Sequence, residues 1–141
     1  KGVMGDLDDV ILKPLSISMV VGKVKELLKD KKYDYIFTHG KNGEYGHLRH
    51  KEIHNAVKRM IKEEELRCKK VFYFDYLAGK NKAPHDSKLR IPVPNIKAEE
   101  SVKLDNSQFI NKFKLITKFY GFKENIFETL SCHNVESFSL R

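Results

Sequence analysis

Apolar residues recur at spacings of three and four in the first part of the chain. From Ser16 onward this stripe consists of Ile17, Val20, Val21, Val24, Leu27 and Leu28. Such a period predicts an amphipathic helix, with Ser16 as its N-cap. A charged turn follows at 29–32, and the next run, Tyr33 to Phe37, is aromatic and β-branched and short enough for a strand. The pattern therefore predicts a helix followed by a strand.

The same order of elements continues along the chain. Three glycines and an asparagine between Thr38 and Gly46 indicate a loop. Helical spacing resumes from about Arg49 to Glu64, and the apolar run Val71 to Phe74 predicts a second buried strand. Strand, loop, helix and strand in this order imply a parallel pair with a right-handed crossover. We therefore expect an α/β fold with a Rossmann-like parallel sheet flanked by helices, in one domain spanning 1–141.

The second half of the chain gives a less regular pattern. Three of the four prolines and many lysines lie between Leu77 and Glu100, which predicts a long loop with a short extended piece near Ile91–Pro94. A further helical stripe consists of Phe109, Ile110, Phe113, Ile116, Phe119 and Tyr120. It predicts a helix that ends at Gly121, with its phenylalanines in the core. Residues 125–141 fit no single element.

Composition and charge narrow the class of protein. Because 40% of the residues are apolar, the chain has enough apolar surface to form a core. The net charge is +8, but the lysines are spread along the chain and mixed with acidic residues, which favours a solvated surface over a nucleic-acid site. No apolar run is long enough for a membrane span, and no signal-peptide pattern opens the sequence. Cys68 and Cys132 form no Cys-x-x-Cys pair, which favours a reducing cytoplasm.

Four histidines fall within sixteen residues around the predicted loop and the helix that follows it. They are His39, His47, His50 and His54. Ligands of parallel α/β sheets bind at the carboxyl ends of the strands, which is where this loop would lie, and imidazole is a common zinc ligand. No acidic residue stands at an obvious partner spacing. The cluster by itself leaves open a metal or catalytic site and a set of solvent-facing histidines, and His54 is expected to be an ordinary helix-face residue.

The segment from Tyr35 to Val57 resembles the second signature of the LmbE-like family, also called the N-acetylglucosaminyl-phosphatidylinositol de-N-acetylase family. The shared pattern is a strand ending in Thr38-His39, a turn Gly43-Glu44-Tyr45-Gly46, and then His47-x-x-His50. Members of this family have a Rossmann-like fold and remove an acetyl group from an amino sugar or a related amide. The resemblance implies a zinc-dependent N-deacetylase that acts on a small N-acetylated, sugar-like substrate.

The resemblance also implies roles for single residues. His50 matches the histidine that ligates zinc, and Tyr45 matches the tyrosine that helps to polarise the amide carbonyl. His47 matches the histidine thought to stabilise the tetrahedral oxyanion or to protonate the leaving amine. Glu44, Arg49 and His39 are candidate substrate-binding residues, and for Glu44 an alternative is that it orients the backbone of the loop.

Two departures from the family pattern limit what the chain is expected to do alone. Many members have Pro-Asp between the two histidines, whereas Leu48-Arg49 stands here, which removes a carboxylate that orients its neighbour and places a cation near the metal. The family's His-Pro-Asp-Asp motif, which supplies two zinc ligands and the general base, is absent. We interpret Asp6, Asp8 and Asp9 as a loop and not as a displaced motif. We therefore expect an incomplete copy of the family fold, with the first motif on an upstream segment that precedes Lys1.

A different class of function stays open beside the enzyme. A binding protein that retains the fold without the chemistry would use Arg49 and the basic loop from Lys80 to Arg90 to hold a phosphorylated sugar or an acidic partner. Nucleic-acid binding driven by net charge is a weaker alternative. Whether the chain forms a homo-oligomer is left open by the sequence.

Overall fold

The computed structural model describes residues 5–9, 11, 13–84 and 86–140. The chain is a mixed α/β protein whose strands pair in both parallel and antiparallel fashion, so the α/β class is confirmed. Its contacts divide it into two compact units, one made of the residues up to Tyr73 with the last two residues, the other of residues 74–139. The two units are described separately below.

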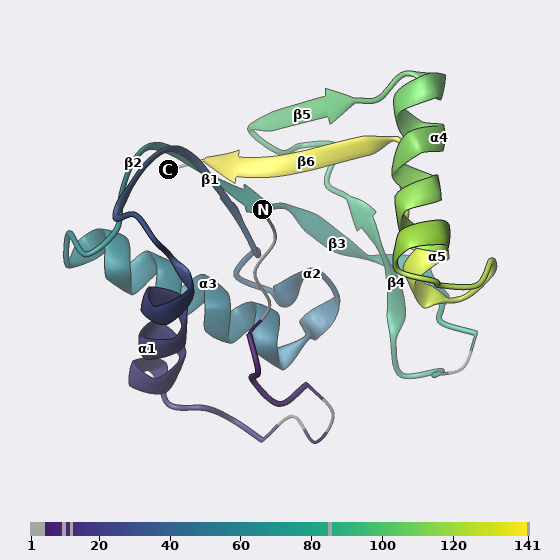
Figure 1. The fold of residues 1–141 in the computed structure, drawn as a ribbon. Helices are drawn as coiled ribbons and strands as arrows, with labels where there is room; N and C mark the ends of the chain where they lie inside the picture. The colour runs from purple at the N-terminus through teal and green to yellow at the C-terminus, as the bar shows by residue number, and fades with distance from the viewer. Residues whose placement is uncertain (1–4, 10, 12, 85, 141) are drawn as a thin grey trace. The chain divides into compact units, whose positions relative to one another are not determined.

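The first unit contains the helix and strand that open the chain, followed by a crossover. Its elements are α1 (Ile17–Leu27), β1 (Lys32–Thr38), α2 (Gly43–Gly46), α3 (Leu48–Lys62) and β2 (Arg67–Phe74) (Figure 1). The hydroxyl of Ser16 accepts a hydrogen bond from the backbone N–H of Met19 at 3.3 Å, which confirms the predicted N-cap. The predicted helices and strands of this half of the chain are all present.

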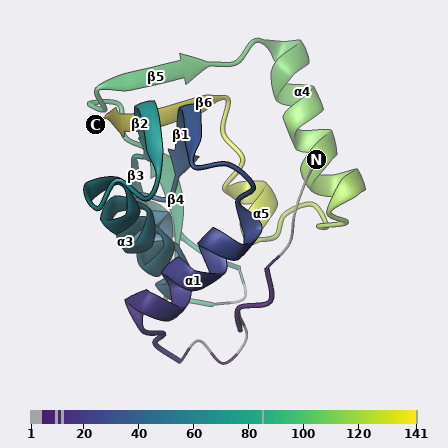
Figure 2. The same cartoon turned by 60° about the vertical axis from the view of Figure 1, so that its left-hand side comes forward.

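The strands β1 and β2 are parallel and are joined through α3. Their register runs from Lys32 opposite Arg67 to Thr38 opposite Tyr73, which confirms the predicted parallel pair. Figure 2 shows α1 and α3 beside this pair. The core consists of Val20, Val21, Ala56, Val57, Met60 and Leu66. Because the crossover fixes where β1 ends, it also fixes where the histidine-rich loop begins.

The second unit begins with a hairpin where the sequence predicted a loop. The strands β3 (Tyr76–Lys82) and β4 (Arg90–Pro94) pair antiparallel, so the loop prediction is wrong over 77–82, while the extended piece near Ile91–Pro94 is confirmed. A Cβ at Gly79 would lie 2.4 Å from the carbonyl oxygen of Ile91, which makes glycine necessary at this close approach. The prolines of β4 fit a strand because an edge position does not need their missing N–H.

The rest of the second unit contains a second antiparallel pair and two helices. The strands are β5 (Glu100–Lys103) and β6 (Val135–Leu140), and the helices are α4 (Asn106–Lys114) and α5 (Phe127–Leu130). A π-helical turn, η1 (Leu115–Phe119), continues α4, and Gly121 follows it at a φ of 75°. The predicted helix is confirmed, but the assignment of its phenylalanines to the core is not. Neither α4 nor η1 has a buried residue, Phe109 and Phe113 are half-buried, and Phe119 is 83% exposed. A π-helical turn contains more residues than an α-helical one, so Phe119 falls out of phase with the stripe.

Among the residues with an assigned conformation, no helix has both the length and the apolar character needed to cross a membrane.

Met60 provides a test of the core of the first unit, because its side chain is 2% exposed among the other core residues. We expect Met60→Ala to lower the free energy of unfolding by about 2–5 kcal/mol, through lost burial and the cavity that remains. Phe119→Ala is the control and should change the free energy of unfolding by no more than about 0.5 kcal/mol. Urea titration followed by circular dichroism measures both. Equal losses in the two variants would contradict the assignment of core and surface.

Candidate functional site

The loop after β1 turns sharply before α3 begins. Gly43, Glu44 and Gly46 have positive φ angles of 65°, 57° and 98°. This left-handed region is costly for residues with a Cβ atom, and a Cβ at Gly43 would also lie 3.0 Å from the Lys51 side chain. The Asn42 side chain accepts a hydrogen bond from the backbone N–H of Glu44 at 3.2 Å. The turn therefore holds Glu44 in a strained conformation with its side chain directed back into the loop.

The carboxylate of Glu44 joins the two ends of this loop. Its Oε1 atom accepts a hydrogen bond from the backbone N–H of Gly40 at 2.7 Å. Its Oε2 atom lies 3.0 Å from Nδ1 of His39 and 2.5 Å from Nδ1 of His50. The two imidazole rings stack, with centroids 3.8 Å apart and an angle of 13° between their planes. One carboxylate thus contacts two histidines and the backbone between them.

Hydrogen bonding keeps this carboxylate ionised. Burial alone would raise the pKa of Glu44, but hydrogen bonds from His39, His50 and Gly40 outweigh it and lower the pKa to about 2. An ionised carboxylate only accepts hydrogen bonds, so Nδ1 of each imidazole is the donor. A carboxylate that orients histidines in this way is common beside metal ions.

His47 and Tyr45 lie against the same pair of rings. The centroid of the His47 ring is 4.5 Å from that of His50 and 5.5 Å from that of Tyr45, while Tyr45 and His50 are 5.4 Å apart. Burial, and then the proximity of His50, lowers the pKa of His47, so its imidazole is neutral at neutral pH. Within the described part of the chain, the buried Nδ1 atom of His47 has no hydrogen-bond partner. The structure brings together His39, Glu44, Tyr45, His47 and His50, and their catalytic and substrate-binding roles stay predictions.

Arg49 faces a different part of the first unit. Its guanidinium donates to the carbonyl of Asp8 at 2.5 Å, to the carbonyl of Lys13 at 2.8 Å and to the carboxylate of Glu52 at 2.6 Å. Only 7% of its side chain is exposed. Glu52 in turn accepts a hydrogen bond from the backbone N–H of Leu15 at 2.8 Å. Arg49 therefore ties the N-terminal segment to α3, and these contacts occupy the guanidinium; its predicted role in substrate binding stays untested.

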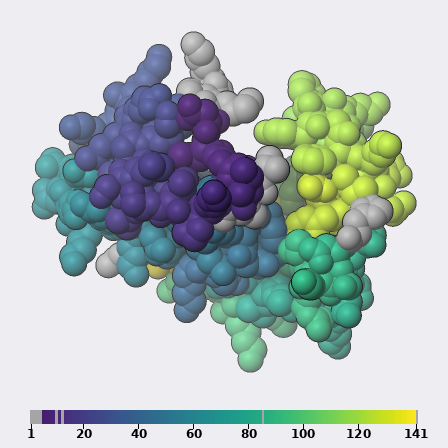
Figure 3. All heavy atoms as spheres, turned by 90° about the horizontal axis from the view of Figure 1, so that it is seen from below, coloured from purple at the N-terminus to yellow at the C-terminus, as the bar shows by residue number. Residues whose placement is uncertain are grey.

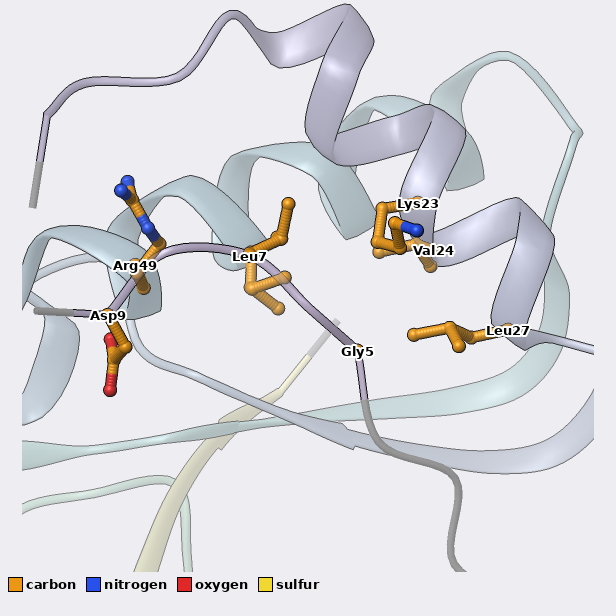
Figure 4. Close-up of a pocket in the computed structure, with 8 residues that line it drawn as sticks. Gly5, Leu7, Asp9, Lys23, Val24, Leu27 and Arg49 are labelled. Carbon is orange, nitrogen blue, oxygen red and sulfur yellow. The ribbon is translucent and has the colours of Figure 1, made fainter.

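The N-terminal segment lies on the surface of this unit (Figure 3) and borders a cavity of about 330 Å³. Figure 4 shows Arg49 and Asp9 at one end of this cavity and Leu27 at the other. The carboxylate of Asp9 is 3.6 Å from Nε2 of His47, which is beyond hydrogen-bond distance. Asp6, Asp8 and Asp9 belong to a segment without regular structure, as predicted.

Three side chains of the loop have the chemistry and spacing of a metal site. His39, Glu44 and His50 each offer a ligand atom, and these atoms lie within 4.8 Å of one another. Neighbouring ligand atoms in a tetrahedral zinc site are roughly 3.4 Å apart, since the bonds are about 2.1 Å long. The separations of 3.0 and 2.5 Å are those of hydrogen bonds, so an ion would take the place of these two hydrogen bonds as the atoms move apart by less than about 1 Å, and each neutral imidazole would keep its proton on the other ring nitrogen.

Sequence reasoning found the histidines but missed the acidic partner. Glu44 is five residues from His39 and six from His50, which matches no helical or strand spacing. Its contacts depend on the positive φ angles of the turn. The flanking residues Gly43 and Gly46 were the available signal, because glycines on both sides of an acidic residue indicate a turn that can reverse its direction.

His54 lies on α3 and is buried, with Nδ1 donating to the carbonyl of His39 at 2.9 Å. Its ring is 4.9 Å from that of Tyr73 on β2. It is a residue of the helix face, as expected, and it additionally holds the end of β1 against α3.

The low pKa of Glu44 predicts a pH dependence of stability for the metal-free protein. The folded-state pKa of about 2 lies below the ordinary value of 4.5, so the ionised carboxylate contributes stability above pH 4.5 that is lost as the pH falls toward 2. Glu44→Gln should lack this contribution. Urea titrations of both proteins across this interval, with a chelator present, should show a difference that shrinks as the pH falls. A difference that stays constant with pH would contradict the assignment.

Comparison of the chain with protein-family models, with curated proteins and with solved structures gave no match. Membership of the family that the sequence resembles is therefore a proposal.

Proposed function

We propose that this chain is the C-terminal part of a zinc-dependent N-deacetylase that acts on an N-acetylated sugar or a related amide, with part of the active site outside this chain. The observation that carries the proposal is the convergence of Tyr45, His47 and His50 after β1, with ring centroids 4.5–5.5 Å apart. These are the three residues to which the family resemblance gives roles in amide hydrolysis. The parallel crossover from β1 to β2 supports the proposal, since it is the building block of a Rossmann-like sheet.

The chemistry of each side chain fits its proposed role. A zinc ion lowers the pKa of its bound water and polarises a carbonyl. His50 would hold the ion through a ring nitrogen, at the position where its imidazole contacts the carboxylate of Glu44. The phenol of Tyr45 would donate a hydrogen bond to the amide carbonyl as negative charge develops there.

For His47 we propose stabilisation of the oxyanion, and its lowered pKa supports this role over protonation of the leaving amine. A neutral imidazole has an N–H to donate, but it must first take up a proton before it protonates a leaving amine. Its Nδ1 atom is buried and has no hydrogen-bond partner within the described residues.

A cytoplasmic location is part of the proposal. Cys68 and Cys132 are free thiols, and burial raises the pKa of both, which keeps them protonated at neutral pH. Free thiols persist in a reducing compartment.

The test is deacetylation of N-acetylated amino sugars by the chain extended with its upstream segment, measured as acetate release. We expect turnover in the extended protein, loss of turnover in His50→Ala, and a fall in kcat of about 100-fold or more in Tyr45→Phe, because one donor to the developing oxyanion is removed. His133→Ala is the control, because that residue lies outside the site; its Nε2 is 2.8 Å from the carbonyl of Pro92. Unchanged turnover in His50→Ala would refute the proposal.

The same samples separate the enzyme from a non-catalytic binding protein. A sugar phosphate that binds equally well with and without EDTA, in a protein that releases no acetate, would support the binding protein. Because the Arg49 guanidinium is occupied by Glu52 and by the N-terminal segment, such binding would depend on the basic residues between Lys80 and Arg90.

A further inference from the structure

We propose that this chain binds one divalent transition-metal ion by itself, through His39, Glu44 and His50, without a ligand from the upstream motif. The inference deepens the proposed function, because it concerns the metal of the same site. It differs from the family pattern, in which the upstream motif supplies two of the zinc ligands. Here His50 is retained, and His39 and Glu44 take the places of the two absent ligands.

The first support is the convergence of three donor groups from one continuous segment. His39 follows the last residue of β1, Glu44 lies in the turn, and His50 lies in the first turn of α3. Their ligand atoms are within 4.8 Å of one another. Two nitrogen donors and one carboxylate oxygen are a ligand set that zinc and its neighbours in the transition series prefer over magnesium or calcium.

The second support is that the carboxylate is already positioned. Oε1 of Glu44 is held by the backbone N–H of Gly40, which leaves Oε2 as the single oxygen directed at both imidazoles. The Glu44 side chain is only 11% exposed, and its backbone has a φ of 57°. A largely buried carboxylate on a strained residue indicates a conformation that the surroundings enforce.

The third support is the packing of the donor groups. The rings of His39 and His50 are stacked with centroids 3.8 Å apart, and one oxygen of Glu44 contacts Nδ1 of both rings. Three protein ligands leave one tetrahedral position open for water or substrate, as in catalytic zinc sites.

The experiment uses the 141-residue chain alone, stripped with EDTA and then titrated with zinc and, separately, with cobalt. Calorimetry gives affinity and stoichiometry, and the absorption of bound cobalt reports its coordination. We expect one ion per monomeric chain. His133→Ala is the matched control, because it also removes one histidine but not a proposed ligand, and it should bind zinc with the affinity of the unmodified chain.

Glu44→Gln separates a ligand from a residue that only orients His50. Loss of an orienting partner weakens metal binding by about 10–100-fold, and we expect Glu44→Gln and His39→Ala each to weaken it by more than about 100-fold. Circular dichroism and urea titration establish that each variant is folded. If His39→Ala does not fold, Glu44→Gln still tests the proposal, because glutamine keeps the shape of the glutamate side chain. A weaker effect in Glu44→Gln would assign the carboxylate to orientation and overturn the proposed ligand set.

Two further outcomes keep this inference distinct from the proposed function. A folded chain that binds no zinc alone, but binds it and releases acetate when extended upstream, would refute the inference and leave the deacetylase standing. A chain that binds one zinc alone, but has no turnover when extended, would support the inference and refute the deacetylase. One ion shared by two chains in a dimer, detected by sedimentation, would also refute the single-chain site.

Discussion

The corner between β1 and α3 depends on one buried carboxylate. An ionised group in a largely buried position is costly unless hydrogen bonds satisfy it, and Glu44 obtains these from Gly40, His39 and His50. The same contacts hold the loop backbone at Gly40 and keep the two imidazoles stacked against each other. The histidine chemistry of the protein therefore follows from the placement of a single acidic side chain.

The crossover from β1 through α3 to β2 determines where this corner lies, and Arg49 anchors the N-terminal segment to α3 next to it. The parallel register of β1 and β2 fixes where Thr38 ends the strand, and His54 bonds the carbonyl of His39 from α3. Arg49 lies only one residue before His50, yet it points to the N-terminal segment and to Glu52. Adjacent residues of α3 therefore serve different purposes, because neighbouring side chains on a helix point about 100° apart.

The sequence lacks the His-Pro-Asp-Asp motif of the family that it resembles, and this bears differently on the two proposals. Glu44 contacts two histidines and a backbone amide, so it is not available as a general base for an attack of water on an amide. The three groups that could hold an ion, in contrast, lie within one loop. The proposed metal site is therefore self-contained, whereas the proposed deacetylation needs additional residues.

The sequence by itself determined the elements whose residues interact locally. The helix from Ile17, the strands around Tyr35 and Val71, the crossover helix and their parallel pairing all follow from apolar period and order. The histidine cluster at the end of β1 follows from the same order, because parallel strands present their carboxyl ends at one edge. These patterns are read over a few residues, so no long-range contact is needed to recognise them.

Only the tertiary structure decided the contacts that depend on backbone direction and on distant partners. Glu44 reaches both histidines because three positive-φ residues within four positions, two of them glycines, reverse the chain. Arg49 turns inward because Asp8 and Lys13, far away in sequence, offer carbonyl groups there. The hairpin of β3 and β4 forms because Gly79 admits the backbone of Ile91, and Phe119 is exposed because a π-helical turn shifts its phase. Apolar periodicity carries no information on any of these features, since each is set by a backbone conformation or by a partner remote in sequence.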